Sequence, residues 1–137
     1  MPKSGLMPAP ALERTPAPYD QPPSLLPFFR DDAARYVWMI REVDRRTKDR
    51  PFARDTAFRN CGALAFGISV DELLSAEAGA RKPHLMVPRQ KLICATRLLT
   101  GATWHRLGFV FQRDHSTIIN NYKRAFDDVA PILRKLA

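Results

Sequence analysis

The sequence predicts an all-α protein: a small helical domain with a helix-turn-helix, preceded by a proline-rich tail and an extra helix. Apolar residues recur at helical spacing from residue 31 onward, and no alternating pattern indicates a strand. Eight of the twelve prolines fall within residues 1–27. A chain of 137 residues supports a single modest core. We therefore divide it into a disordered tail (1–27), an amphipathic helix (28–50) and a helix-turn-helix domain (51–137).

The proline-rich tail lacks the features of a folded segment. Each proline removes an amide donor and disfavours a helix, so residues 1 to about 23 should be disordered or extended. The prolines also interrupt the continuous apolar run that a secretory signal needs. No stretch approaches the roughly 18 apolar residues that span a bilayer. We expect a soluble, cytoplasmic protein without a membrane partner.

The first predicted helix covers residues 31–48. Asp31 and Asp32 favour its start because carboxylates are stabilised near helix N-termini. One face of this helix is apolar and consists of Ala33, Tyr36, Val37, Ile40 and Val43. Such a face is typical of a domain core, but it could instead bind a protein partner or a second copy of the chain.

Two helices are predicted in the middle of the chain. One runs from about residue 53 to 66, and Gly67 is suited to its C-cap. Ser69 and Glu72 have the spacing of a capping box, which predicts a short helix after Ser69. Residues 75–87 contain glycine and proline and should form a basic loop.

The remaining segments have the pattern of a helix-turn-helix. One helix is expected from Pro88 to about Leu99, and Thr103 can cap a short helix at 104–109. A tight turn at 111–113 then leads into a last helix, which we expect to be closed by two acidic residues, Asp127 and Asp128. Two short helices joined by such a turn, the second polar and basic at its front, predict a DNA-binding motif.

The net charge of +8 lies entirely in the carboxyl-terminal part. Residues 1–80 hold eleven basic and eleven acidic side chains, whereas residues 81–137 hold eleven basic and three acidic ones. A polyanion is the natural partner of such a block, and phosphate neutralisation would make the affinity depend on salt. The alternative is a basic surface that is simply solvated.

The segment from Arg113 to Arg124 combines a polar front with an apolar stripe, as a recognition helix requires. Its front is polar: Asp114 can cap the helix, accept a hydrogen bond from a cytosine amino group, or do both. His115, the next residue, is either a structural or catalytic histidine or a DNA contact. Ser116 and Thr117 are either first-turn caps or contacts to phosphates and thymines. Farther along lies an apolar stripe of Ile118, Ile119, Tyr122 and Phe126.

An ordered set of short motifs carries a resemblance to a known family. The motifs are Ile68-Ser69-Val70-Asp71-Glu72-Leu73-Leu74-Ser75, Pro88-Arg89-Gln90, Leu99-Thr100, Leu107-Gly108, Phe111 and Arg113-Asp114-His115-Ser116-Thr117. Each motif alone is weak, but the ordered set is specific. From about residue 58 to 126 the chain resembles the C-terminal DNA-binding domain of the bacterial chromosomal replication initiator, DnaA.

The resemblance implies binding to the nine-base-pair initiator box of bacterial origins. A recognition helix would enter the major groove, and an arginine of the basic loop the adjacent minor groove. By position, the implied DNA-contacting residues are Arg81 in the minor groove, Arg89 and Arg97 on the backbone, and Arg113, Asp114, His115, Ser116 and Thr117 at the recognition turn.

Several departures from the family pattern bear on the DNA sequence that is bound. The basic loop is longer than usual, so Lys82 competes with Arg81 for the minor groove. Gln112 stands where the family usually has two small residues. Asn120 replaces a frequent histidine near the DNA, and His105 replaces a proline that commonly touches a thymine methyl group. We therefore expect the preferred site to differ from the standard box.

No constellation in the sequence indicates catalysis, a metal or a cofactor. The 137 residues contain no Gly-x-x-x-x-Gly-Lys-Ser/Thr phosphate loop, so we expect neither nucleotide binding nor ATP hydrolysis. The histidines and cysteines lack the paired spacing of a zinc site. Cys61 and Cys94 lie among apolar residues and should be buried free thiols. The protein is therefore not expected to be an enzyme.

Three hypotheses for function remain. The first is a nucleoid-associated module that binds double-stranded DNA at initiator-box-like sites and regulates replication initiation or nearby transcription. The second is a helix-turn-helix transcription factor with unrelated operators. The third is a protein-interaction adaptor, in which the helix at 31–48 carries the function and the DNA surface is vestigial.

Overall fold

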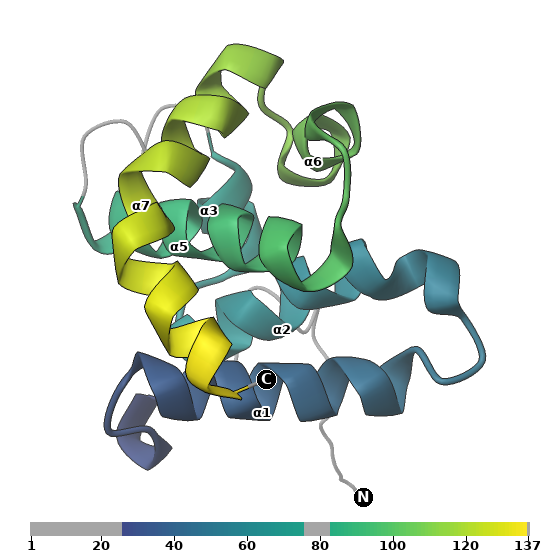
Figure 1. Cartoon of the computed structure of the whole chain (residues 1–137), viewed down its shortest axis with the longest axis vertical. Coiled ribbons are helices and arrows are strands. Elements are labelled where there is room, and N and C mark those ends of the chain that lie inside the picture. The colour runs from purple at the N-terminus through teal and green to yellow at the C-terminus, as the bar shows by residue number, and fades with distance from the viewer. Residues whose placement is uncertain (1–25, 76–82, 137) are drawn as a thin grey trace, which may run out of the picture.

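The computed structural model describes residues 26–75 and 83–136, and these residues form helices without any strand (Figure 1). The predicted all-α class is thereby confirmed. The proline-rich tail before residue 26 and the two basic residues Arg81 and Lys82 lie outside the described residues. In chain order the elements are η1 (Leu26–Phe28), α1 (Asp32–Arg46), η2 (Pro51–Ala53), α2 (Arg54–Phe66), α3 (Val70–Leu74), α5 (Pro83–Thr100), α6 (Trp104–Phe111) and α7 (His115–Leu136).

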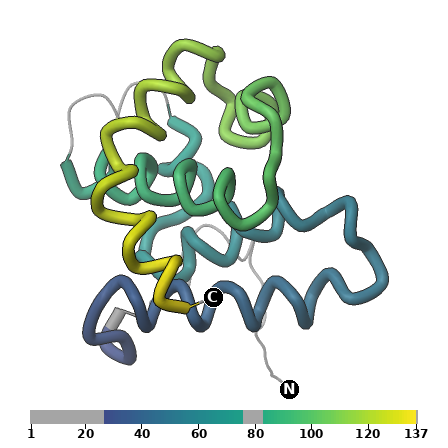
Figure 2. Tube along the Cα trace, viewed as in Figure 1, coloured from purple at the N-terminus to yellow at the C-terminus, as the bar shows by residue number. Residues whose placement is uncertain are grey.

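The helices are arranged around α5 and α2 (Figures 1 and 2). In Figure 1, α1 runs along the bottom, α2 packs between α1 and α5, and α5 crosses the middle of the view. Helix α7 starts at the top, packs along α5 and ends against α1. Helix α6 contacts both α2 and α7. The first turn of α7 therefore projects from the end of the molecule opposite α1.

The helix ends follow the capping signals of the sequence. Asp31 caps α1, since its carboxylate accepts a hydrogen bond from the amide of Ala34 at 2.9 Å. Gly67 ends α2 with a φ of 70°, a conformation that favours glycine. Ser69 and Glu72 form the predicted capping box of α3, with hydrogen bonds of 3.0 and 3.1 Å.

Two helices are longer than predicted. Helix α5 begins at Pro83, not at Pro88, because the first turn inserts Leu85, which is 1% exposed, into the core. Burial of this side chain offsets the hydrogen bond that Pro88 cannot donate. Helix α7 continues to Leu136, so the prediction that Asp127 and Asp128 close it was wrong. The buried face continues beyond them through Val129, Ala130 and Leu133.

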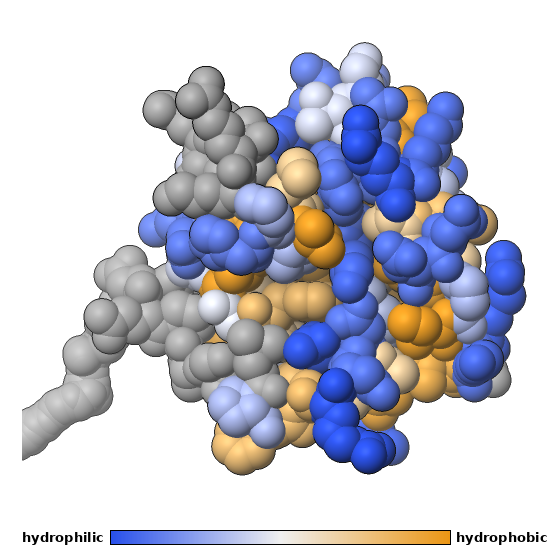
Figure 3. All heavy atoms as spheres, turned by 90° about the vertical axis from the view of Figure 1, so that its left-hand side faces the viewer, coloured by the Kyte–Doolittle hydropathy of each residue, from blue (hydrophilic) through white to orange (hydrophobic). Residues whose placement is uncertain are grey.

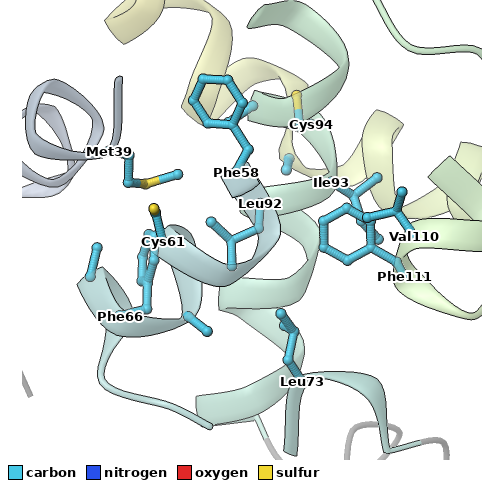
Figure 4. Packing of buried hydrophobic residues seen from close by; sticks show 14 of the residues in the cluster. Met39, Phe58, Cys61, Phe66, Leu73, Leu92, Ile93, Cys94, Val110 and Phe111 are labelled. Atoms are coloured by element: carbon cyan, nitrogen blue, oxygen red, sulfur yellow. The ribbon is translucent and has the colours of Figure 1, made fainter. Parts of the chain in front are cut away.

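The core lies where α2 and α5 cross (Figure 4). Leu92 and Ile93 of α5 are fully buried and lie beside the side chains of α2 and α6. The close approach of α2 depends on Gly62, because a Cβ there would lie 2.2 Å from a methyl carbon of Leu92. Cys61 and Cys94 are buried free thiols, as predicted, and burial raises the pKa of both.

The apolar face of α1 belongs to this core. Tyr36, Met39 and Val43 are each 0% exposed, and Met39 faces Cys61 of α2 in Figure 4. The structure thus favours the first of the two interpretations of this helix, because these three side chains are covered within the chain itself. No helix of the described part is both long and apolar enough to cross a bilayer.

Candidate nucleic-acid interface

A tight turn joins α6 to α7. Gln112 adopts the left-handed conformation with a φ of 54°, and the amide of Arg113 donates to the carbonyl of Gly108 at 3.0 Å. Gly108 is required at this crossing, because a Cβ there would lie 2.7 Å from the carbonyl oxygen of Arg113. The two helices and this turn form the predicted helix-turn-helix, with α7 as its second helix.

Asp114 caps α7. Its carboxylate accepts the amide of Thr117 at 2.9 Å, and its carbonyl accepts the amide of Ile118 at 3.0 Å. Hydrogen bonds from the backbone and the side chain of Thr117 to the carboxylate lower the pKa of Asp114, so this group is ionised at neutral pH. Asp114 is exposed, so an ionised acceptor stands at the front of the helix, available to a base edge.

His115 follows the cap and pairs with His105 of α6. Nδ1 of His105 lies 3.1 Å from Nε2 of His115, and the two rings meet edge to face with centroids 5.2 Å apart. Both side chains are exposed. One ring must donate and the other accept, so the bond links the tautomers of the two imidazoles and fixes the orientation of His115.

We call residues 114–118, the cap and first turn of α7, the leading turn; its other side chains are divided between solvent and core. Ser116 and Asn120 are exposed and Thr117 is partly buried. Ile118 is 0% exposed and anchors the turn in the core. Phe109 of α6 is 72% exposed and lies with His105 and His115 around a shallow recess. Figure 3 shows that hydrophilic side chains gather at the upper end of the molecule, where the first turns of α7 lie.

Two of the arginines expected to contact DNA are hydrogen-bonded to carbonyl groups of the protein itself. Arg89 is only 5% exposed, and its guanidinium donates to the carbonyl oxygens of Leu73 at 2.8 Å and Ser75 at 3.0 Å. Arg113 is partly buried and donates to Leu74 at 2.9 Å and Ser75 at 2.7 Å. Both guanidinium groups lie at the carboxyl end of α3, where the last carbonyls of a helix are available to side-chain donors.

Arg97 is also engaged within the protein. Its guanidinium donates to the carbonyl of Ala102 and stacks over the ring of Trp104, 4.1 Å from the ring centroid. Trp104 in turn packs edge to face on Tyr122 of α7 at 5.1 Å. Arg97 therefore connects the end of α5 to the helix-turn-helix, and its side chain is not a free exposed cation.

These contacts leave most of the positive charge of the carboxyl-terminal part without a neutralising carboxylate. Carboxylates neutralise only two of the engaged cations: Lys91 pairs with Asp32 at 2.6 Å and Arg106 with Asp55 at 2.5 Å. Neutral carbonyls bind the guanidinium groups of the other engaged arginines and leave their charge uncompensated. Within residues 83–136, the exposed cations for which the structure shows no ion pair are on α7: Lys123, Arg124, Arg134 and Lys135. The field can still attract a polyanion.

Comparison with known protein families gives the decisive observation. Residues 62–125 match the family described as the bacterial dnaA protein helix-turn-helix. This segment is similar to the DnaA helix-turn-helix, and we call it the DnaA-type segment. Neither the search of curated proteins nor the search of solved structures found a match.

The DnaA-type segment includes the leading turn of α7. It extends from within α2 through the first half of α7, so it includes the whole of α3, α6 and the turn between α6 and α7. Domains of this family bind DNA. The match therefore supports DNA binding by this segment, and the matched family is a DNA-binding and not a catalytic one. No three side chains of His, Cys, Asp or Glu gather around a metal position in residues 26–75 and 83–136.

Some features of the DnaA-type surface have no signal in the sequence. The contact between His105 and His115 joins residues ten positions apart on two helices, and only the crossing angle brings their rings together. The sequence likewise does not show that Phe109 points outward, because α6 is apolar along most of its length. The close approach of the turn to α6 did have a signal in the sequence, because Gly108 belongs to the Leu107-Gly108 pair of the family motif.

Proposed function

We propose that this protein binds double-stranded DNA in a sequence-specific manner, at sites related to the nine-base-pair initiator box. The observation that supports this proposal best is the leading turn of α7. It is exposed, capped by an ionised carboxylate, and fixed from beneath by the buried Ile118. Such a turn combines base-edge acceptors and donors with helix amides that attract a phosphate.

The proposed contact set consists of residues that are exposed or partly exposed on this turn or beside it. Asp114 and His115 would contact base edges, and Ser116 and Thr117 bases or phosphates. His105 and Asn120 flank them and stand where the family has other residues. The preferred site should therefore be a diverged relative of the standard box, since these two positions lie close to the bases.

The regulatory role follows from competition for a shared site. Two proteins with the same type of helix-turn-helix that recognise related boxes exclude each other from the DNA. We propose that occupation of such boxes by this protein, in the nucleoid, hinders replication initiation or represses a nearby promoter. This role requires only recognition of the box.

Selection of bound fragments from random duplex DNA tests the proposal. Enrichment of a nonamer related to the initiator box supports it, and footprinting of the origin of the host should then show protected copies of that nonamer. Enrichment of an unrelated motif would instead support a transcription factor with its own operators. If no motif is enriched and the helix 31–48 captures a protein partner, the adaptor hypothesis replaces both.

A further inference from the structure

Two guanidinium groups meet at the carboxyl end of α3. Nε of Arg89 donates to the carbonyl of Leu73 at 2.8 Å, and Nη1 of Arg113 donates to the carbonyl of Leu74 at 2.9 Å. The carbonyl of Ser75 accepts from both side chains, at 3.0 Å from Arg89 and 2.7 Å from Arg113. Three consecutive carbonyls thus bind two arginines, one from α5 and one from the turn between α6 and α7.

The chemistry of this cluster explains why two cations can share it. The last carbonyls of a helix have no intrahelical partner and carry partial negative charge, which stabilises a cation. Burial and the nearby charge of Arg113 lower the pKa of Arg89 to about 10, so Arg89 stays protonated at neutral pH. The planar fork of arginine reaches two carbonyls at once, which the single ammonium of lysine cannot do.

The cluster connects the leading turn of α7 to the rest of the domain. Arg113 stands directly before the cap Asp114, and its amide is bound to Gly108 of α6. Its side chain reaches Ser75, which is 38 residues away in sequence, at the end of α3. Arg89 holds the same carbonyl from α5. The orientation of the turn is therefore tied to α6 on one side and to α3 and α5 on the other.

We propose that Arg89 and Arg113 are positioning residues for DNA recognition. They hold the leading turn of α7 at a fixed orientation against α3 and α5, and their guanidinium groups stay on the carbonyls when DNA is bound. Sequence discrimination then depends on them, although neither contacts a base or a phosphate. This inference rests on the DNA surface proposed above, and it adds residues that act on that surface from beneath.

The substitutions Arg113→Lys and Arg89→Lys test this positioning role. Lysine keeps the positive charge but lacks the planar guanidinium that reaches two carbonyls at once. We expect the affinity for the selected site to fall about tenfold or more, as for a misplaced base contact. The affinity for random duplex and the slope of log K against log salt should not change. If Arg113 bound a phosphate, Arg113→Lys would bind almost normally and Arg113→Ala would reduce the slope by about one.

Two controls separate positioning from a general loss of stability. Val43→Ala destabilises the protein from α1, far from the leading turn, and should leave the site-specific affinity unchanged at a temperature where it is folded. Arg124→Lys changes an exposed cation of α7 and should have little effect on discrimination. If the lysine variants at positions 89 and 113 discriminate as well as these controls do, the inference is overturned.

Nuclear magnetic resonance of the unsubstituted protein gives a second test that does not depend on the folding of any variant. The side-chain N–H signals of Arg89 and Arg113 should be protected from exchange in the free protein and should stay in place when the selected duplex is added. Movement of the Arg113 signals with contacts to the DNA backbone would overturn the inference alone. A wild-type protein that shows no sequence preference would overturn it together with the proposed function.

Discussion

The carboxylate of Asp114 caps α7 and is also accessible to DNA. One oxygen accepts the amide of Thr117, and the side chain remains exposed at the front of the helix. Since the pKa of Asp114 is lowered in the folded protein, the cap stabilises the fold above the ordinary carboxyl pKa. This contribution is lost as the pH falls through the lowered value. The same ionised state is the one required for the proposed hydrogen bond from a cytosine amino group.

We predict that Asp114→Asn and Asp114→Ala separate these two roles. Asparagine is also a good N-cap, so Asp114→Asn should melt close to the wild-type temperature, whereas Asp114→Ala should melt lower. Both should weaken discrimination at one base pair, because an amide or a methyl group does not replace an ionised acceptor. Thermal melting and binding to a set of singly substituted duplexes measure the two effects. Full discrimination by Asp114→Ala would exclude base contact by this residue.

The histidine pair leads to a second prediction at this scale. His105 lies in the first turn of α6, where proline is tolerated, so His105→Pro should fold. It removes the bond that orients His115 and restores the residue that the family commonly has. We expect the motif selected from random DNA to move toward the standard initiator box. His84→Ala, at an exposed residue of α5, is the control and should select the wild-type motif. An unchanged motif from His105→Pro would contradict a role in specificity.

At the scale of the element, the turn between α6 and α7 carries a residue in an unfavourable conformation. Gln112 has a φ of 54°, and a side chain other than glycine costs about 1 kcal/mol in this region. We predict that Gln112→Gly stabilises the protein by about 0.5–1 kcal/mol against urea.

Gly101→Ala is the control for that prediction, because it places a side chain at a positive φ where Gln112→Gly removes one. Gly101 has a φ of 70°, and an added Cβ would meet no atom within 4 Å, so only backbone strain is introduced. The variant should lose about 1 kcal/mol. If Gln112→Gly is less stable than the wild type, the side chain of Gln112 has a stabilising role that the turn geometry does not reveal.

The elements differ in how far the sequence predicts them. The caps at Asp31, Ser69 and Thr103 depend on residues three positions apart, and such local signals are visible in the sequence. The ends of α5 and α7 depend on whether Leu85 and Leu133 reach the core, which is a tertiary property.

The candidate site shows the same division between local and tertiary signals. The order of motifs predicts the leading turn and its cap, because the cap and its amide partner are three residues apart. The burial of Arg89 is not predictable, because its carbonyl partners lie 14 to 17 residues away and on another helix. Basic composition identifies a DNA-binding region, but it does not distinguish the arginines that bind DNA from those that bind carbonyl groups.

At the scale of the whole molecule, α1 makes the domain larger than its DnaA-type segment. Tyr36, Met39 and Val43 fill the space beside α2 and α7, and Lys91 of α5 is paired with Asp32. Burial of each large apolar side chain contributes about 1.5–3 kcal/mol. The face that the sequence left open to a partner is therefore part of the support for α2 and α7.

We predict that a fragment of residues 51–137 has lost most of its folding stability. It contains the entire helix-turn-helix but exposes the surfaces of α2 and α7 that α1 covers. A fragment of residues 26–137 retains α1 and is the matched comparison. Chemical denaturation followed by circular dichroism should show a cooperative transition for the longer fragment alone. If both fragments unfold at the same urea concentration, α1 is a separate appendage.

The central claim is that the leading turn of α7 recognises a particular duplex sequence. The most direct measurement is the affinity of the wild-type protein for its selected duplex and for a scrambled one, at a stated salt concentration near physiological. We predict a ratio of about 1,000 or more, and a loss of most of that ratio in the double variant His115→Ala/Thr117→Ala. Equal, weak binding of the wild-type protein to both duplexes would contradict the claim.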